Sequence, residues 1–252
     1  MYEHFKGEEV FVKKVLEYKE QALYKQKLIV TNFLDPYHQF IVNSCIQGND
    51  DLQILEEGGF LESESKKIII APSFYQIEKE DFQITTAKIT YAKHFDTLKH
   101  SDVLGALMSL GISRDRFGDI VESGDVFYLA VDTKIFSYIK EHITKIKRSK
   151  VNIQSSEDII TVETKFKVQT HIVSSLRLDK IVSAFYKISR AKAVSYIHAG
   201  FVKVNHKIVV EIHYLCNNSD IISLKKHGRM KFVNTNRITK SNNHVVEGHK
   251  YL

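Results

Sequence analysis

Residues 177–200 read RLDKIVSAFYKISRAKAVSYIHAG, and this stretch decides the fold of the last third of the chain. Four apolar side chains recur there at i, i+3, i+4 and i+7, on one face of a short helix: Leu178, Ile181, Val182 and Phe185. Ser189 stands at the N-cap position of a second helix, and Gly200 falls just past its end, where a left-handed residue is common. The stretch therefore predicts two consecutive short helices.

Extended segments follow the two helices. Residues 201–204 and 207–210 flank the dipeptide Asn205-His206, a turn signal between two strands. Residues 221–224 read Ile-Ile-Ser-Leu and predict a further strand. We therefore expect a module of two helices and a hairpin, with these residues in its core: Leu178, Phe185, Ala193, Ile197 and Val204.

The order and spacing of six short motifs in this module resemble the alpha-L RNA-binding motif, the S-four-type domain named after a ribosomal protein. They are Arg177-Leu178-Asp179-Lys180, Ser189-Arg190, Ile197-His198-Ala199-Gly200, Val202-Lys203-Val204-Asn205, Asp220-Ile221-Ile222-Ser223 and Gly228-Arg229. The family usually has Gly at the positions of His206 and Ser219, and the first departure leaves the turn type open. The resemblance implies an RNA-binding domain over residues 174–234.

The charge of the chain is distributed unevenly. Residues 1–80 hold 9 Lys and Arg against 14 Asp and Glu, and residues 81–170 hold 13 against 12. Residues 171–252 hold 14 against 4, a net charge of +10, although the whole chain has a net charge of only +6. A strongly basic domain attached to a mildly acidic part indicates a polyanionic partner such as RNA.

The candidate RNA-binding residues come from this basic module. Arg177 and Arg190 match the family's basic positions at the starts of the two helices, where guanidinium groups and exposed N–H groups can meet phosphate oxygens. Asp179 is expected to pair with a nearby cation or to cap the first helix, and Ser189 chiefly to cap the second. The full set of predicted RNA-binding residues is Arg177, Lys180, Ser189, Arg190, Lys192, Lys203, Asn205, Lys207 and Arg229.

The middle third of the chain has the rhythm of a ferredoxin-like fold. Its predicted elements are strands over residues 82–91, 118–121, 126–131 and 159–168, and helices over 102–110 and 133–146. This β-α-β-β-α-β order also occurs in RNA-recognition folds. The paired aromatic residues that such a fold uses to stack bases are not identified in the sequence.

A second resemblance covers nearly the whole chain. The motifs His100-Ser101-Asp102, Leu104-Gly105-Ala106-Leu107, Leu110-Gly111-Ile112, Arg114-Asp115, Gly118-Asp119-Ile120, Gly58-Gly59-Phe60 and Ile70-Ala71-Pro72 resemble the YlmH family of bacterial RNA-binding proteins. The resemblance implies a non-enzymatic ribosome-associated quality-control factor. Its implied partners are rRNA of the large ribosomal subunit and peptidyl-tRNA, with a further link to cell division and division or translation proteins.

Two alternatives stay open beside this function: an RNA-modifying enzyme guided by the basic module, and an interaction protein of cell division. Ser101 is not expected to be a nucleophile, because consecutive helical residues point about 100° apart and cannot form a relay with their neighbours. We expect Ser101 to be a helix N-cap. A zinc site of His206, His213, Cys216 and His227 lacks the tight two-ligand spacings of structural zinc sites. We expect no catalytic residue, metal or cofactor.

The sequence thus predicts an α+β protein with three domains and a tail. They are a small N-terminal α/β domain over residues 1–78, a ferredoxin-like (RRM-like) middle domain over 79–170, a C-terminal alpha-L RNA-binding domain over 174–234, and a loose tail over 235–252. No apolar stretch approaches the ~18 residues that span a bilayer, and the first residues do not resemble a signal peptide. We therefore expect a cytoplasmic location and no membrane partner.

Overall fold

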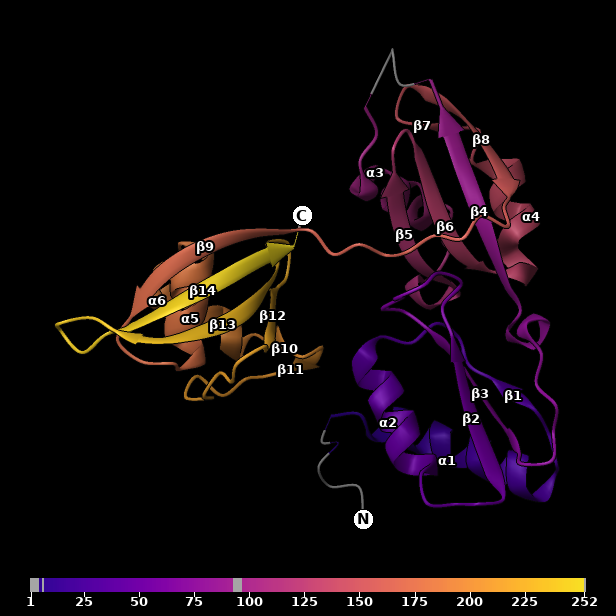
Figure 1. The fold of residues 1–252 in the computed structure, drawn as a ribbon, viewed down its shortest axis with the longest axis horizontal. Helices are drawn as coiled ribbons and strands as arrows, with labels where there is room; N and C mark the ends of the chain where they lie inside the picture. Colours follow the sequence, from indigo (N-terminus) through magenta and orange to yellow (C-terminus); the bar gives the residue numbers. More distant parts are fainter. Residues whose placement is uncertain (1–4, 6, 93–96, 252) are drawn as a thin grey trace. The chain divides into compact units, whose positions relative to one another are not determined.

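The computed structural model describes residues 5, 7–92 and 97–251. The chain forms two compact units, residues 1–162 and residues 163–252 (Figure 1). The first unit contains the N-terminal and middle domains, and the second contains the basic module. No helix in the described ranges is both long and apolar enough to cross a membrane.

The N-terminal domain packs two helices on a small antiparallel sheet with strand order β1-β3-β2. Its elements are α1 (Glu9–Tyr24), β1 (Ile29–Val30), α2 (Pro36–Ile46), β2 (Leu52–Glu57) and β3 (Lys67–Pro72). Pro36 opens α2, a position where a missing N–H costs nothing, and Asp35 caps it by accepting the N–H of His38 at 2.9 Å. Every residue of β3 is buried, so this strand is the centre of the domain.

The middle domain has the predicted ferredoxin-like topology. Its elements are β4 (Ile84–Tyr91), α3 (His100–Ser109), β5 (Phe117–Ser123), β6 (Val126–Asp132), α4 (Thr133–His142), β7 (Lys145–Ile146) and β8 (Ser149–Ser155), with the short 3-10 helices Lys79–Phe82 and Arg114–Arg116. The sheet order is β5-β6-β4-β8-β7, with antiparallel pairs throughout, as in a split βαβ fold. The predicted closing strand over residues 159–168 is wrong, because β8 closes the sheet instead.

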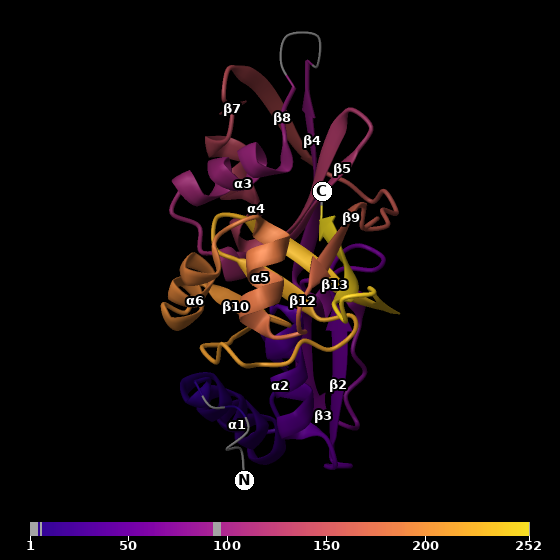
Figure 2. The same cartoon turned by 90° about the vertical axis from the view of Figure 1, so that its left-hand side faces the viewer.

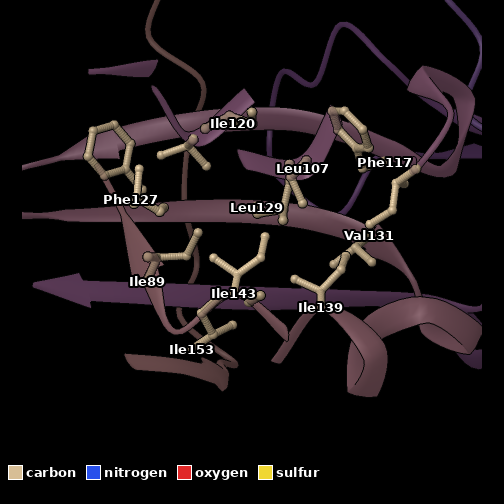
Figure 3. Close-up of a cluster of buried hydrophobic side chains, with 14 of the residues drawn as sticks. Ile89, Leu107, Phe117, Ile120, Phe127, Leu129, Val131, Ile139, Ile143 and Ile153 are labelled. Atoms are coloured by element: carbon tan, nitrogen blue, oxygen red, sulfur yellow. The ribbon is translucent and has the colours of Figure 1, made fainter. Parts of the chain in front are cut away.

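Helices α3 and α4 cover one face of the middle sheet. Figure 3 shows the core beneath them, where side chains of β4, β5, β6 and β8 converge on Leu107 of α3 and Ile139 of α4. Phe117, Leu129 and Val131 are fully buried there. The alternation of β6 sends every second residue into this core, and the residues between them point to the opposite face.

The opposite face of the middle sheet is also buried. Tyr128 and Ala130 of β6 pack against Phe33 and Phe60 of the N-terminal domain. Gly118 of β5 permits this close approach, since a Cβ at that position would lie 2.7 Å from a ring carbon of Phe33. The segment after β8 adds Ile160 and Val162 to the same cluster, and residues 61 and 161 form an isolated β-bridge.

A buried ion pair joins the two domains of the first unit. Lys67 Nζ of β3 lies 2.9 Å from Asp132 Oδ2 at the end of β6, and both side chains are almost fully buried. Lys67 Nζ also donates to the Gln83 carbonyl at 3.1 Å, and Arg116 lies 3.4 Å from the other Asp132 oxygen. The N-terminal and middle domains are therefore tied together by charge as well as by apolar packing.

The second unit is a six-stranded antiparallel sheet with two helices on one face. Its elements are β9 (Phe166–Val173), α5 (Leu178–Tyr186), α6 (Arg190–His198), β10 (Val202–Val204), β11 (Lys207–Ile208), β12 (Ile221–Leu224), β13 (Gly228–Ile238) and β14 (His244–Tyr251). The strand order is β11-β10-β12-β13-β14-β9. Helices α5 and α6 lie together over the sheet (Figure 2), and Phe185 of α5 packs on Phe232 of β13 and Val246 of β14.

The predicted loose tail over residues 235–252 is wrong. Most of it belongs to the hairpin of β13 and β14, and β14 pairs along its whole length with β9. The pairing is anchored in the core, because Val246 is fully buried and Gly248 lies against the Phe185 ring. Strand β9 also takes up residues 166–168, which the sequence had placed in the middle sheet.

Candidate RNA-binding surface

A buried carboxylate organises the starts of α5 and α6. Asp179 is fully buried, and its oxygens accept hydrogen bonds from Arg177 Nε at 3.1 Å, Arg177 Nη2 at 3.2 Å and Arg190 Nε at 2.8 Å. Arg177 immediately precedes α5, and Arg190 is the first residue of α6. One carboxylate therefore holds two guanidinium groups at two neighbouring helix N-termini, which confirms that Asp179 pairs with cations.

The charges of this arrangement are stable at neutral pH. Burial by itself would raise the pKa of Asp179, but the hydrogen bonds from Arg190 and Arg177 outweigh it and lower the pKa below its usual value. Arg190 is 53% exposed and commits only its Nε to Asp179. A guanidinium has five N–H donors, so the groups of Arg190 that face solvent can bind phosphate oxygens.

The first turns of both helices carry further cations. Ser189 caps α6, as predicted, because its Oγ accepts the backbone N–H of Lys192 at 3.2 Å. The Lys192 side chain is exposed, and its Nζ lies 5.5 Å from the centre of the Tyr196 ring. Lys180 is half-buried in the first turn of α5. We call Arg177, Lys180, Arg190 and Lys192 the helix-start cluster.

The hairpin between β10 and β11 is shaped by residues with positive φ. Asn205 and His206 have φ of +49° and +68°, the pattern of a type I′ turn, which answers the question that the sequence left open. The Asn205 amide donates to Asp220 Oδ1 at 2.8 Å and accepts the N–H of Ile221 at 2.8 Å. Asn205 was predicted to bind RNA, but its side chain is committed to these internal bonds. Lys207, next to the turn, is half-buried.

Two predicted RNA-binding residues, Lys203 and Arg229, lie on the face of the sheet that α5 and α6 do not cover. Val202 and Val204 of β10 are buried beneath the helices, so Lys203 between them points to the opposite face. Arg229 of β13 stacks on the ring of Tyr251 of β14, with 4.2 Å from the guanidinium carbon to the ring centre. The predicted residues thus do not form one continuous surface, and sequence reasoning missed Tyr251 because it expected a loose tail.

The His100-Ser101-Asp102 motif has a structural role different from the predicted one. Helix α3 begins at His100, so Ser101 is inside the first turn and is not the N-cap. Asp102 instead reaches back to accept the N–H of Lys99 at 2.8 Å and pairs with Lys147 at 2.6 Å. The pKa of Asp102 is lowered, and the hydrogen bond from Lys147 is the largest cause.

The four residues considered as zinc ligands were His206, His213, Cys216 and His227. No group of three His, Cys, Asp or Glu side chains among the described residues is arranged to hold a metal ion. Cys216 is buried, and burial together with the nearby Asp220 raises the pKa of its thiol to about 12. The thiol is therefore protonated at neutral pH.

A pocket of about 940 Å³ lies in the first unit, between the N-terminal and middle domains. Acidic residues dominate its polar lining: Glu56, Glu57, Glu62, Glu80, Glu157 and Asp158. Lys66 and Lys79 are the two basic residues that line it. This balance of charge repels a phosphate backbone, so the pocket itself is unsuited to RNA.

Comparisons with known proteins match three successive parts of the chain. Residues 7–75 match the model "YlmH, N-terminal", residues 78–169 match "Putative RNA-binding domain in YlmH", and residues 176–222 match "S4 domain". The "Ribosome-associated protein quality control protein P2" of Bacillus subtilis (strain 168) is 30% identical over 243 residues, which cover 95% of this chain and 94% of that protein. The solved structure "Cell division protein ylmH from Streptococcus pneumoniae" is 25% identical with a TM-score of 0.54, and covers 63% of this chain and 99% of its own. The chain belongs to the YlmH family, with an S4 domain at its C-terminal end.

Proposed function

We propose that this protein is a non-enzymatic factor that docks on rRNA of the large ribosomal subunit and acts on complexes carrying a stalled peptidyl-tRNA. The observation that carries the proposal is the buried Asp179, which presents Arg177 and Arg190 at two adjacent helix starts. The S4 match and the name of the Bacillus subtilis relative support a ribosome-associated RNA-binding role.

Recognition through the helix-start cluster depends on phosphate and shape. An A-form helix hides its base edges in a deep, narrow major groove, so cations at helix N-termini meet its backbone. Four phosphate contacts would give a slope of about −3 to −4 in log K against log salt. We therefore expect affinity for rRNA to fall by about 100-fold between roughly 50 and 200 mM salt.

The test is co-sedimentation of the full chain with separated small and large ribosomal subunits. Reversing Arg177 or Arg190 would remove one of the two cations that pair with buried Asp179 and place a second carboxylate beside it, so binding and folding would be lost together. The informative variant is Lys180→Glu/Lys192→Glu, which leaves both Asp179 ion pairs in place. Its matched control is Lys134→Glu/Lys140→Glu, with the same charge change on exposed positions of α4.

Selective binding to the large subunit is expected, with loss in Lys180→Glu/Lys192→Glu and retention in the control. Equal losses in the two variants would mean that net charge, and not the helix-start cluster, drives docking. Binding to neither subunit would overturn the ribosomal assignment. Addition of a purified peptidyl-tRNA–subunit complex then tests the finer proposal, because tighter binding to that complex than to the empty large subunit is expected.

A further inference from the structure

The sheet of the second unit has one face that its helices do not cover. Met230, Phe232 and Val246 alternate into the core under α5 and are at most 3% exposed. Their neighbours along β13 and β14 point to the opposite face, because successive side chains of a strand alternate. On that face Phe166 is 38% exposed and Val168 is 54% exposed.

Aromatic rings and cations lie next to each other on this open face. Phe166 of β9 pairs with Tyr251 of β14, with ring centres 4.9 Å apart and planes at 72°. Arg229 stacks on the same Tyr251 ring, and the Phe166 ring centre lies 5.8 Å from that of His249. We call this set the open-sheet platform: Phe166, Lys203, Arg229, Lys231, His249 and Tyr251.

The strand registers order these side chains in rows across the sheet. Lys203 of β10 is opposite Ser223 of β12, and Ser223 is opposite Arg229 of β13. The row therefore leads from a lysine through an arginine to the Tyr251 and Phe166 rings. In the next row Lys231 is opposite His249. Glu247, an acidic residue on this face, lies 3.0 Å from His249 Nε2.

We propose that the open-sheet platform binds single-stranded RNA, with unpaired bases stacked on Tyr251, Phe166 and His249 and the backbone held by Lys203, Arg229 and Lys231. Every base has a π-face that stacks on an aromatic ring, and a guanidinium adds cation–π attraction. Open antiparallel sheets with such rings are a known means of holding unstacked RNA bases. An apolar protein partner would not account for the three cations among the rings.

This site is distinct from the helix-start cluster. The cluster lies at the N-termini of α5 and α6, on the covered side of the sheet, whereas the platform lies on the uncovered side. Phe166, Arg229, His249 and Tyr251 also lie outside residues 176–222, which match the S4 domain. The inference rests on the proposed RNA-binding role and does not depend on the ribosome as its target.

The test measures binding of the full chain to a fluorescein-labelled, unstructured decauridine RNA. Phe166→Leu/Tyr251→Leu removes both rings and keeps apolar bulk. Loss of two stacking contacts is expected to weaken binding by about 10- to 100-fold. Phe74→Leu/Tyr75→Leu is the matched control, since it removes an exposed aromatic pair from the first unit. That control is expected to bind like the wild type.

A second measurement is independent of how well the variant folds. Photocrosslinking of wild-type protein to 4-thiouridine RNA is expected to label peptides from β9 and β14. Failure of the wild type to bind the oligomer, or crosslinks confined to other elements, would overturn the proposal, as would equal affinity of the two double variants. A platform built for protein or lipid would give the same negative results. Subunit co-sedimentation in parallel separates the two proposals, because oligomer binding without subunit docking overturns the ribosomal one alone.

Discussion

The middle sheet and the C-terminal sheet differ in what lies on the face away from their helices. Both are antiparallel, and both carry two helices on one face. In the middle sheet the other face is buried, and Tyr128 lies 5% exposed against Phe33 and Phe60. In the C-terminal sheet it is open and bears Phe166 and Tyr251. Accessibility of the face, and not topology, decides which of the two sheets can stack bases.

The comparison also changes where RNA contact is expected in the middle domain. Residues 78–169 match a model described as a putative RNA-binding domain. Tyr128 lies on the outer side of β6, where its hydroxyl donates a hydrogen bond to Asp158 at 2.6 Å and Lys88 Nζ lies 5.4 Å from its ring centre. Its ring is closed off by these partners and by the N-terminal domain. Any RNA contact of this domain therefore uses a different surface.

The largest effect is expected from breaking the Lys67–Asp132 ion pair, which ties the N-terminal domain to the outer face of the middle sheet. Asp132→Ala leaves Lys67 buried without its carboxylate and removes the N-cap of α4, so unfolding of the first unit should become easier by about 3–5 kcal/mol. Hydrogen exchange of the full chain should speed up in β3, β4 and β6, and stay unchanged in β13 and β14. Asp51→Ala, at an exposed position, should change stability by less than about 0.5 kcal/mol. Faster exchange in both units would contradict the prediction that this ion pair stabilises the first unit alone.

A matched pair of Phe→Ala variants compares the two sheet faces directly. Phe60 is 7% exposed in the cover of the middle sheet, so Phe60→Ala should cost about 3 kcal/mol of unfolding free energy. Phe166→Ala, on the open face, should cost less than about 1 kcal/mol, because much of its ring already faces water. Urea unfolding followed by circular dichroism measures both. Similar costs would show that the two faces are equally buried.

The smallest expected effect is a pH dependence of the stability of the second unit, caused by His171 on the covered face of its sheet. His171 lies beside Phe185, and burial, assisted by Lys187, lowers its pKa. Its buried Nε2 has no hydrogen-bond partner within the part of the chain that the structure describes. The unfolded chain then binds the proton more readily, so stability falls as the pH drops below about 6.5. His171→Leu should flatten that fall between about pH 7.5 and pH 5.5.

The helices of the second unit were predictable because local signals agree there. The apolar spacing up to Phe185 predicts the first helix, and the cap at Ser189 and the left-handed Gly200 predict the start and the end of the second, as the structure has them. The topology of the middle domain was predictable for a similar reason, since its helices and its first three strands have clear periodicity. These elements need little information from distant residues.

Strands with weak patterns were not predictable. In β8 only Val151 and Ile153 are apolar, so the β-branched residues after it gave a stronger and misleading signal. Strand β14 contains Gly248, which usually weakens a strand, yet here its missing side chain makes room for the Phe185 ring. In both cases the deciding contact is with a residue far away in sequence.

The candidate site was predictable residue by residue but not as a surface. The motif located Arg177 and Arg190, and Asp179 was expected to pair with a nearby cation or to cap the first helix. It did not reveal that Asn205 is committed to Asp220, or that Arg229 faces away from the helices toward Tyr251. These facts depend on which face of the sheet the helices cover, and on a strand that the sequence did not predict.

The pairing of β9 with β14 has a consequence for the order of folding. Strand β9 precedes α5, whereas its neighbour in the sheet, β14, is the fifth strand after β9, so this contact closes a long loop. Contacts between distant segments form late, because closing the loop costs chain entropy before the contact itself contributes any stabilisation. Helices α5 and α6, by contrast, are adjacent in sequence. During synthesis we therefore expect Arg177 and Arg190 to reach their positions at the helix starts before Phe166 pairs with Tyr251.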